Sequence, residues 1–138
     1  MNRRSWITVF AVIAGIVTGY ENICQAQGYY LGETDKAYSY RRLLGRWHRS
    51  DNGCVLQITN IIVRSGTAEL LYFAGSISAR IDSAQITEYG NGLRLIIDLG
   101  SAGQFGHVYD LMYDRSKNTL SGVYHQPPGA DVNVVFQQ

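Results

Sequence analysis

The stretch "LLGRWHRSDNGCVLQIT", residues 43–59, contains two runs of alternating residues separated by a turn signal. Gly45 and Trp47 share one side of the first run, and the second run starts at Cys54. The sequence DNG at 51–53 is typical of a tight connection, because Asn and Gly accept the positive φ that hairpin turns require. This stretch therefore predicts two antiparallel strands joined by a short turn.

The chain after this hairpin repeats the same pattern. Segments rich in Val, Ile, Leu and Tyr alternate with short groups of Gly, Asn, Asp and Ser. The predicted strands are 44–50, 54–64, 67–74, 76–85, 86–89 (which can continue the one before), 93–99, 107–115, 119–125 and 131–137. No segment has the helical periodicity of a crossover, so neighbouring strands should be antiparallel. We predict an all-β fold over 44–138, a single eight-stranded antiparallel up-and-down barrel, with a two-sheet sandwich as the alternative.

The N-terminal residues have the features of a secretory signal peptide. Two arginines precede an uncharged apolar run of 11 residues, Ile7–Val17, which is shorter than the roughly 20 residues of a membrane span. We expect cleavage after Ala26, a surface extension over 27–43, and a secreted or periplasmic protein with no membrane segment left after cleavage.

Composition excludes several classes of function. Cleavage would leave ten basic and ten acidic side chains with no basic run longer than Arg41-Arg42, which gives no electrostatic basis for binding nucleic acid. Cys54 would be the only remaining cysteine, so no internal disulfide is expected. Packing and strand pairing must then supply the stability.

Period-two alternation assigns side chains to the two faces of the sheet. Along 93–99 the odd-numbered residues are apolar, whereas Arg94 and Asp98 are charged, so the odd-numbered side is internal. The same reasoning collects five aromatic residues in the interior: Trp47, Tyr72, Tyr109, Tyr113 and Tyr124. Eight apolar residues fall on the predicted outer face: Ile61, Leu71, Phe73, Ile96, Val108, Met112, Val123 and Val135.

The hairpin resembles the opening of the avidins, in which Gly-x-Trp precedes a Gly-Ser step, and the lipocalins share the Gly-x-Trp. The pattern "LSGVY" at 120–124 is similar to a Leu-x-Gly-x-Tyr strand of such barrels. The run from Leu43 to Phe136 is also similar to small secreted bacterial proteins of unknown function with an avidin-like barrel. The resemblance implies the architecture and not biotin binding, because Trp47 would be the only tryptophan after cleavage and Cys54 replaces the serine that contacts the ligand.

Catalytic and metal sites are not indicated. His48, His107 and His125 share no metal-ligand spacing and are expected at the surface or at a barrel end. No acid is placed to orient a Cys54–His pair. Asp110 and Asp114 share a face but lie roughly 13 Å apart along a strand, so they are expected to be solvated. We expect no enzyme activity, cofactor or metal.

Two functions remain open. The first is a small, partly aromatic ligand in the barrel mouth, contacted by Trp47, Tyr72, Tyr109, Tyr113 and Tyr124. The second is a protein-interaction or inhibitor module, or a homo-oligomer, that uses the outer residues Leu71, Phe73, Met112 and Val135. Residues 28–43 are a further candidate for covering that outer face.

Overall fold

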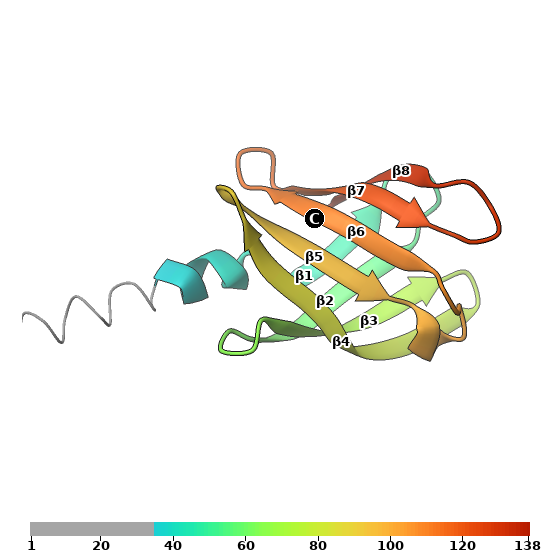
Figure 1. The fold of residues 1–138 in the computed structure, drawn as a ribbon, viewed down its shortest axis with the longest axis horizontal. Helices are drawn as coiled ribbons and strands as arrows, with labels where there is room; N and C mark the ends of the chain where they lie inside the picture. Colours follow the sequence, from blue (N-terminus) through green and yellow to red (C-terminus); the bar gives the residue numbers. More distant parts are fainter. Residues whose placement is uncertain (1–34) are drawn as a thin grey trace, which may run out of the picture. The chain divides into compact units, whose positions relative to one another are not determined.

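Alternating apolar residues form eight strands in the computed structural model, which describes residues 35–138 (Figure 1). The strands are β1 (Gly45–Arg49), β2 (Val55–Ile62), β3 (Thr67–Ala74), β4 (Ile77–Tyr89), β5 (Gly92–Asp98), β6 (Val108–Asp114), β7 (Thr119–His125) and β8 (Val132–Gln137). The two predicted segments 76–85 and 86–89 form the single strand β4. A short 3-10 helix, η1 (Gly100–Ala102), lies between β5 and β6.

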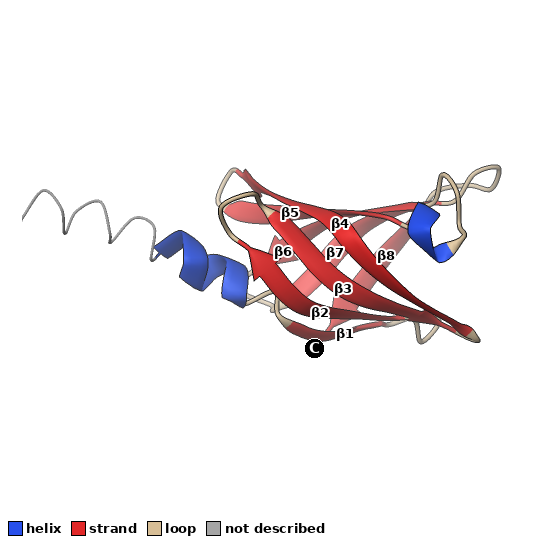
Figure 2. Cartoon of the chain, turned by 90° about the horizontal axis from the view of Figure 1, so that it is seen from below, coloured by secondary structure: helices blue, strands red, loops and turns tan. Residues whose placement is uncertain are grey.

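Each strand pairs antiparallel with the next one, and β8 pairs with β1, so the sheet closes into a barrel (Figure 2). The closing seam is short, with His48 opposite Gln137 and Arg49 opposite Phe136. The predicted up-and-down barrel is confirmed, and the sandwich alternative is wrong. This is also the architecture that the resemblance to avidins and lipocalins implied.

The interior of the barrel is filled by the residues that alternation placed there. On β5, Leu93, Leu95 and Ile97 are buried, while Asp98 is exposed. On β6, Tyr109, Leu111 and Tyr113 are buried in the same way. Because directly opposite residues of paired strands point to the same face, the pairing of Leu95 with Leu111 continues one apolar layer across the sheet.

A bulge on β2 changes which of its residues face the interior of the barrel. The register shifts between Ile58 and Asn60, so two residues of β2 occupy the place of one. Ile61 consequently lies opposite the fully buried Ala68 and packs against the core. The prediction that Ile61 is on the outer face is therefore wrong, because the bulge reverses the alternation after Ile58.

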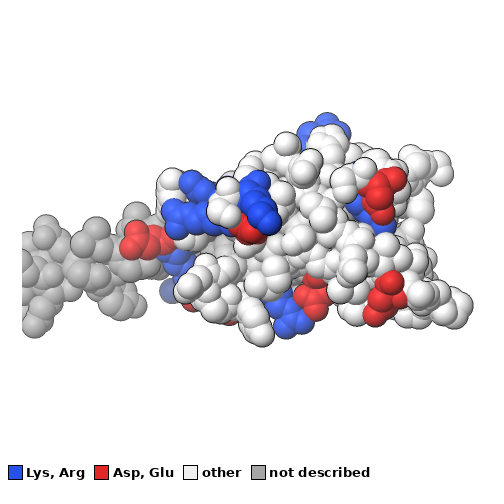
Figure 3. Space-filling model, turned by 90° about the horizontal axis from the view of Figure 1, so that it is seen from above, with Lys and Arg blue, Asp and Glu red and all other residues white. Residues whose placement is uncertain are grey.

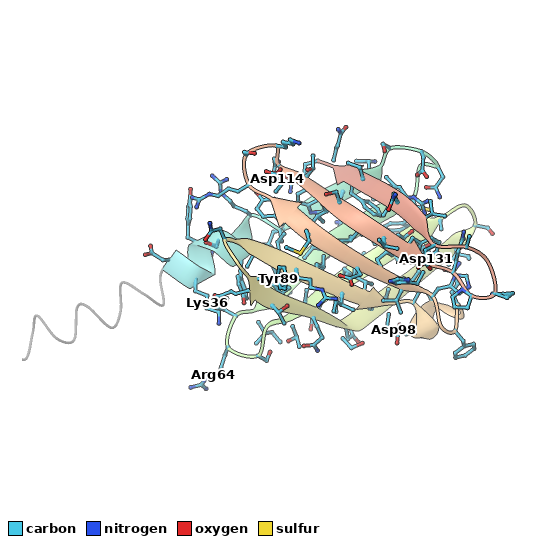
Figure 4. All side chains as sticks on the ribbon, turned by 45° about the horizontal axis from the view of Figure 1, so that its top comes forward. Lys36, Arg64, Tyr89, Asp98, Asp114 and Asp131 are labelled. Atoms are coloured by element: carbon cyan, nitrogen blue, oxygen red, sulfur yellow. The ribbon has the colours of Figure 1, made fainter. Side chains whose placement is uncertain are left out.

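The connections divide into two sets at opposite ends of the barrel. Residues 50–54, 75–76, 99–107 and 126–131 follow β1, β3, β5 and β7, and we call this the loop end. Residues 63–66, 90–91 and 115–118 lie at the opposite end, which we call the far end. Figure 4 labels Asp98 and Asp131 at the loop end, and Arg64, Tyr89 and Asp114 at the far end. The short Gly- and Asn-containing connections agree with the predicted turns.

The barrel belongs to a compact unit that covers Ser39–Gln138. Tyr40 and Leu43, which precede β1, are 2% and 0% exposed and belong to the core cluster. The surface position expected for the extension therefore does not hold at these two residues. The predicted signal peptide, residues 1–26, lies outside the described residues. Within 35–138, no helix has the length and apolar content needed to cross a bilayer.

Candidate functional site

Three of the five inward aromatic residues come together toward the loop end. Tyr109 near the start of β6 stacks on Tyr124 near the end of β7, with ring centroids 4.4 Å apart and planes 21° apart. Tyr72 near the end of β3 meets Tyr109 at 6.4 Å and 60°. All three are less than a tenth exposed. Their hydroxyl-bearing rings form one cluster, which we call the tyrosine cluster.

Trp47 and Tyr113 form a separate pair. Their ring centroids are 6.1 Å apart at 84°. The indole Nε1 of Trp47 donates to the carbonyl oxygen of Leu43, and the Tyr113 hydroxyl donates to Oδ1 of Asn118 in a far-end connection. Tyr109 and Tyr113 are four residues apart along β6, or roughly 13 Å at about 3.3 Å per residue. The structure thus brings three of the five predicted ligand contacts together and places the other two elsewhere.

The tyrosine cluster holds a buried charge that the sequence analysis missed. Arg49, the last residue of β1, is 7% exposed. Its Nη1 donates to the Tyr109 hydroxyl at 3.1 Å, and its guanidinium carbon lies 5.3 Å from the ring centroid of Tyr124. Arg49 follows Trp47 by two residues, so period-two alternation could have placed it inside the barrel. Arginine is rarely buried unless it is paired, which makes it easy to overlook.

The partner of Arg49 is Asp51 in the exposed turn between β1 and β2. Nη2 donates to Oδ2 at 2.9 Å, and Nε lies 2.6 Å from Oδ1 in an ion pair, although its N–H is not aligned for a hydrogen bond. The hydrogen bond from Arg49 holds the pKa of Asp51 below its ordinary value. Burial opposes the charge on Arg49, but the bonds to Asp51 and Tyr109 outweigh it and raise the pKa of the guanidinium.

The tyrosine hydroxyls stay protonated at neutral pH. Burial raises the pKa of Tyr72, with a further contribution from Tyr109. Burial also raises the pKa of Tyr109 to about 12, against the opposing effect of Arg49. The pKa of Tyr124 is raised by burial as well. The cluster therefore combines three neutral hydroxyls with one positive charge.

The connection 99–107 contributes a polar contact to this cluster through His107. Nδ1 of His107 lies 2.7 Å from the Tyr124 hydroxyl, in a hydrogen bond whose donor depends on the tautomer. The side-chain oxygen of Gln104 is buried and has no hydrogen-bond partner within residues 35–138. Phe105, by contrast, is 83% exposed. The connection 99–107 thus places a solvent-facing aromatic ring at the loop end.

His125 and Asp110 have ion-pair partners outside the tyrosine cluster. His48 is exposed, and His125 pairs with Asp131 at 3.0 Å. Asp110 is not simply solvated as expected, because it forms a two-point ion pair with Arg94 at 2.6 and 2.8 Å. In the described part of the chain, no three His, Cys, Asp or Glu side chains are grouped so that they could hold a metal ion.

Four outer residues were predicted to form an interface, namely Leu71, Phe73, Met112 and Val135. Leu71, Phe73 and Met112 are partly exposed and Val135 is 38% exposed, whereas the inward neighbours Leu70, Tyr72, Leu111, Tyr113, Val134 and Phe136 are buried. Charge interrupts this surface: Met112 lies opposite Arg94, and the Arg46 guanidinium carbon is 6.0 Å from the Phe73 ring centroid. On the face shown in Figure 3, basic and acidic groups form small scattered groups among neutral atoms.

Comparison of the chain with protein-family models, with curated proteins and with solved structures finds no significant match.

Proposed function

We propose that this protein is a non-enzymatic binding protein that holds a small, partly aromatic ligand at the loop end of its barrel. The observation that carries the proposal is the buried Arg49 guanidinium, which lies against the Tyr109 hydroxyl and the Tyr124 ring. A buried charge costs free energy that an apolar side chain of similar size would avoid. A group that recognises a ligand is a physical reason for such a charge.

The two ends of the barrel differ in how their polar atoms are satisfied. At the far end, the Trp47 and Tyr113 groups each have a hydrogen-bond acceptor in the chain. At the loop end, each terminal nitrogen of Arg49 has two N–H groups, and the residues in 35–138 accept one hydrogen bond from each. One N–H on each terminal nitrogen therefore has no acceptor within 35–138.

Aromatic surface beside this charge favours a ligand with a ring. Tyr109 and Tyr124 are already stacked, and aromatic pairs add binding free energy beyond the area that they bury. Phe105 extends into solvent from the adjacent connection. Binding rather than catalysis is proposed because, within 35–138, the thiol of Cys54 has no hydrogen-bonded histidine to activate it.

The test compares two tyrosines that differ mainly in their position. Tyr124 and Tyr113 are both 7% exposed and inward, and each hydroxyl bonds one side chain. A panel of small aromatic compounds is screened by calorimetry, and the site is located from backbone amide chemical shifts. We expect shifts in 50–54 and 99–107, and weaker binding in Tyr124→Phe than in Tyr113→Phe. Shifts confined to 115–118 would contradict the proposal.

A secreted or periplasmic location is part of the proposal, and it rests on the arginines and the short apolar run at the N-terminus. The mass of the exported protein tests it, because cleavage after Ala26 defines a single expected product.

The second candidate is an interaction module or homo-oligomer that uses the outer face of the barrel. The outward position of Phe73 and Val135 supports this candidate. The charged pair Arg94–Asp110 crosses the outer faces of β5 and β6, and for this reason we rank the candidate second.

A further inference from the structure

The carboxylate of Asp51 lies where an external anion would meet Arg49. The two side chains meet through an Nη2–Oδ2 hydrogen bond of 2.9 Å and an Nε–Oδ1 ion pair of 2.6 Å, and guanidinium groups bind carboxylates through two nitrogens of this kind. The Arg49 side chain is 6% exposed and the Asp51 side chain 49% exposed. A ligand would therefore reach the buried Arg49 from solvent through the position of the Asp51 carboxylate.

The two partners are held very differently. Arg49 is fixed on β1 and inside the tyrosine cluster by the Tyr109 hydroxyl. Asp51 belongs to the exposed connection 50–54, in which Gly53 has a φ of 72° and the backbone N–H of Cys54 donates to the side chain of Asn52. Within 35–138, Arg49 is the only side chain with which Asp51 forms an ion pair or a hydrogen bond. Removing Asp51 from Arg49 thus gives up the only side-chain partner of Asp51 within 35–138, although the backbone of Asp51 and Asn52 also contacts its carboxylate.

We propose that the ligand is a small aromatic carboxylic acid, and that its carboxylate replaces that of Asp51 on Arg49. This inference rests on the proposed function and adds the chemical class of the ligand. The ligand carboxylate accepts the N–H groups of Nη2 and Nε that Asp51 faces, and its ring lies beside the ring of Tyr124, over which the guanidinium is already placed. The displaced Asp51 turns into solvent.

Asp51 is then an internal competitor of the ligand. A group tethered by a short segment acts at an effective concentration in the millimolar range or above. An external carboxylate must therefore bind Arg49 strongly enough to displace the tethered Asp51 carboxylate. Hydrogen bonds with an ionised partner are roughly twice as strong as neutral ones, and a tenfold change in affinity corresponds to about 1.4 kcal/mol. Removing the charge of Asp51 should therefore tighten binding of a carboxylate by about tenfold or more.

The experiment uses two probes of nearly the same shape, benzoate and its neutral amide, benzamide. Their affinities are measured by calorimetry for the wild type, for Asp51→Asn and for Asp131→Asn. The control variant removes one negative charge from the same end of the barrel, but its carboxylate pairs with His125 and not with Arg49. We expect Asp51→Asn to bind benzoate about tenfold more tightly, with less than a twofold change for Asp131→Asn and for benzamide.

Several results would overturn the inference. If Asp131→Asn strengthens benzoate binding as much as Asp51→Asn does, the effect is general electrostatics and not displacement. If benzamide binds at the loop end as well as benzoate does and Asp51→Asn changes neither, the ligand class is wrong but the proposed function stands. If no compound of the aromatic panel binds any variant, the proposed function fails as well.

A second variant and a measurement on the wild type keep the test independent of how Asp51→Asn folds. Asp51→Ser keeps a turn-forming residue and also removes the charge. In the wild type, benzoate should shift the Nε–H resonance of Arg49, whereas benzamide at the same concentration should leave it in place. An Arg49 resonance that is unchanged at saturating benzoate contradicts the displacement.

Discussion

The ring of Tyr109 lies stacked on that of Tyr124, and the same Tyr109 hydroxyl accepts a hydrogen bond from the buried Arg49. One tyrosine therefore links the aromatic part of the loop end to its charge. The stability of the barrel should depend on the protonation of this residue.

Replacing Tyr109 by Phe should change how stability depends on alkaline pH. The folded pKa of Tyr109 is raised to about 12, mainly by burial, whereas an unfolded tyrosine titrates near 10. The stabilisation is complete below about pH 10 and is lost as the pH rises toward 12. Urea unfolding between pH 8 and 11 should show a shallower loss for Tyr109→Phe, and a stability at pH 7 lower by about 1–2 kcal/mol. Equal slopes for the two proteins would contradict the burial of this hydroxyl.

Gly122 should not tolerate a side chain. A Cβ atom at this position in β7 would overlap the backbone carbonyl of Asp110 on β6. Because the obstacle is backbone, the strands must separate, and overpacking of this kind costs about 1–3 kcal/mol. Urea unfolding of Gly122→Ala should show a loss of about 2 kcal/mol or more, whereas Ser121→Ala, its outward neighbour, should stay within about 0.5 kcal/mol of the wild type.

Two adjacent residues of β3 test the assignment of faces. Tyr72 is 2% exposed inside the barrel, and Phe73 is partly exposed outside it. Tyr72→Asp should lose its cooperative thermal transition, because it removes a buried ring that packs on Tyr109 and places a carboxylate inside the barrel. Phe73→Asp should keep the β-sheet circular dichroism of the wild type. If outer-face association is the function, light scattering should also show a smaller species for Phe73→Asp, and Met112→Asp should behave in the same way.

Acid should weaken the barrel in part through Asp110. The hydrogen bonds from Arg94 hold the pKa of Asp110 below its ordinary value. A carboxyl of this kind stabilises the folded state fully above the unfolded pKa of about 3.9, and the stabilisation is lost as the pH falls through the lower folded pKa. Asp110→Asn should therefore be less stable than the wild type at pH 7, and its stability should fall less between pH 5 and 2. Urea midpoints at each pH measure both effects.

Alternation was sufficient to predict most of the barrel, because a period of two is a direct consequence of the pleated backbone. It assigned Leu95, Ile97 and Tyr109 to the interior, where they are fully buried. It failed at Ile61, because strict alternation does not allow for the extra residue that the bulge between Ile58 and Asn60 inserts. It also gave no sign that Tyr40, ahead of the first strand, belongs to the core.

Alternation could not predict which inward residues lie together at the loop end. Strand tilt and stagger decide which inward residues share a level of the barrel, and neither is written in the local pattern. The sequence therefore predicted Trp47 and Tyr124 equally as ligand contacts. In the structure they are separate, because Trp47 packs against Tyr113 and Tyr124 stacks on Tyr109. Arg49 was overlooked because a charge at an inward position contradicts the usual preference for solvent, and only its partners explain it.

The seam between β1 and β8 determines when the protein can complete its fold. The pairs His48–Gln137 and Arg49–Phe136 join β1 to β8. During synthesis the barrel therefore cannot close until β8 has left the ribosome. Until then, β1 and β7 present unpaired strand edges, which are templates for association with other chains. Slow folding is the expected result of contacts that are so distant in sequence. The loss of residues from β8 should therefore leave an open sheet whose exposed edges promote aggregation.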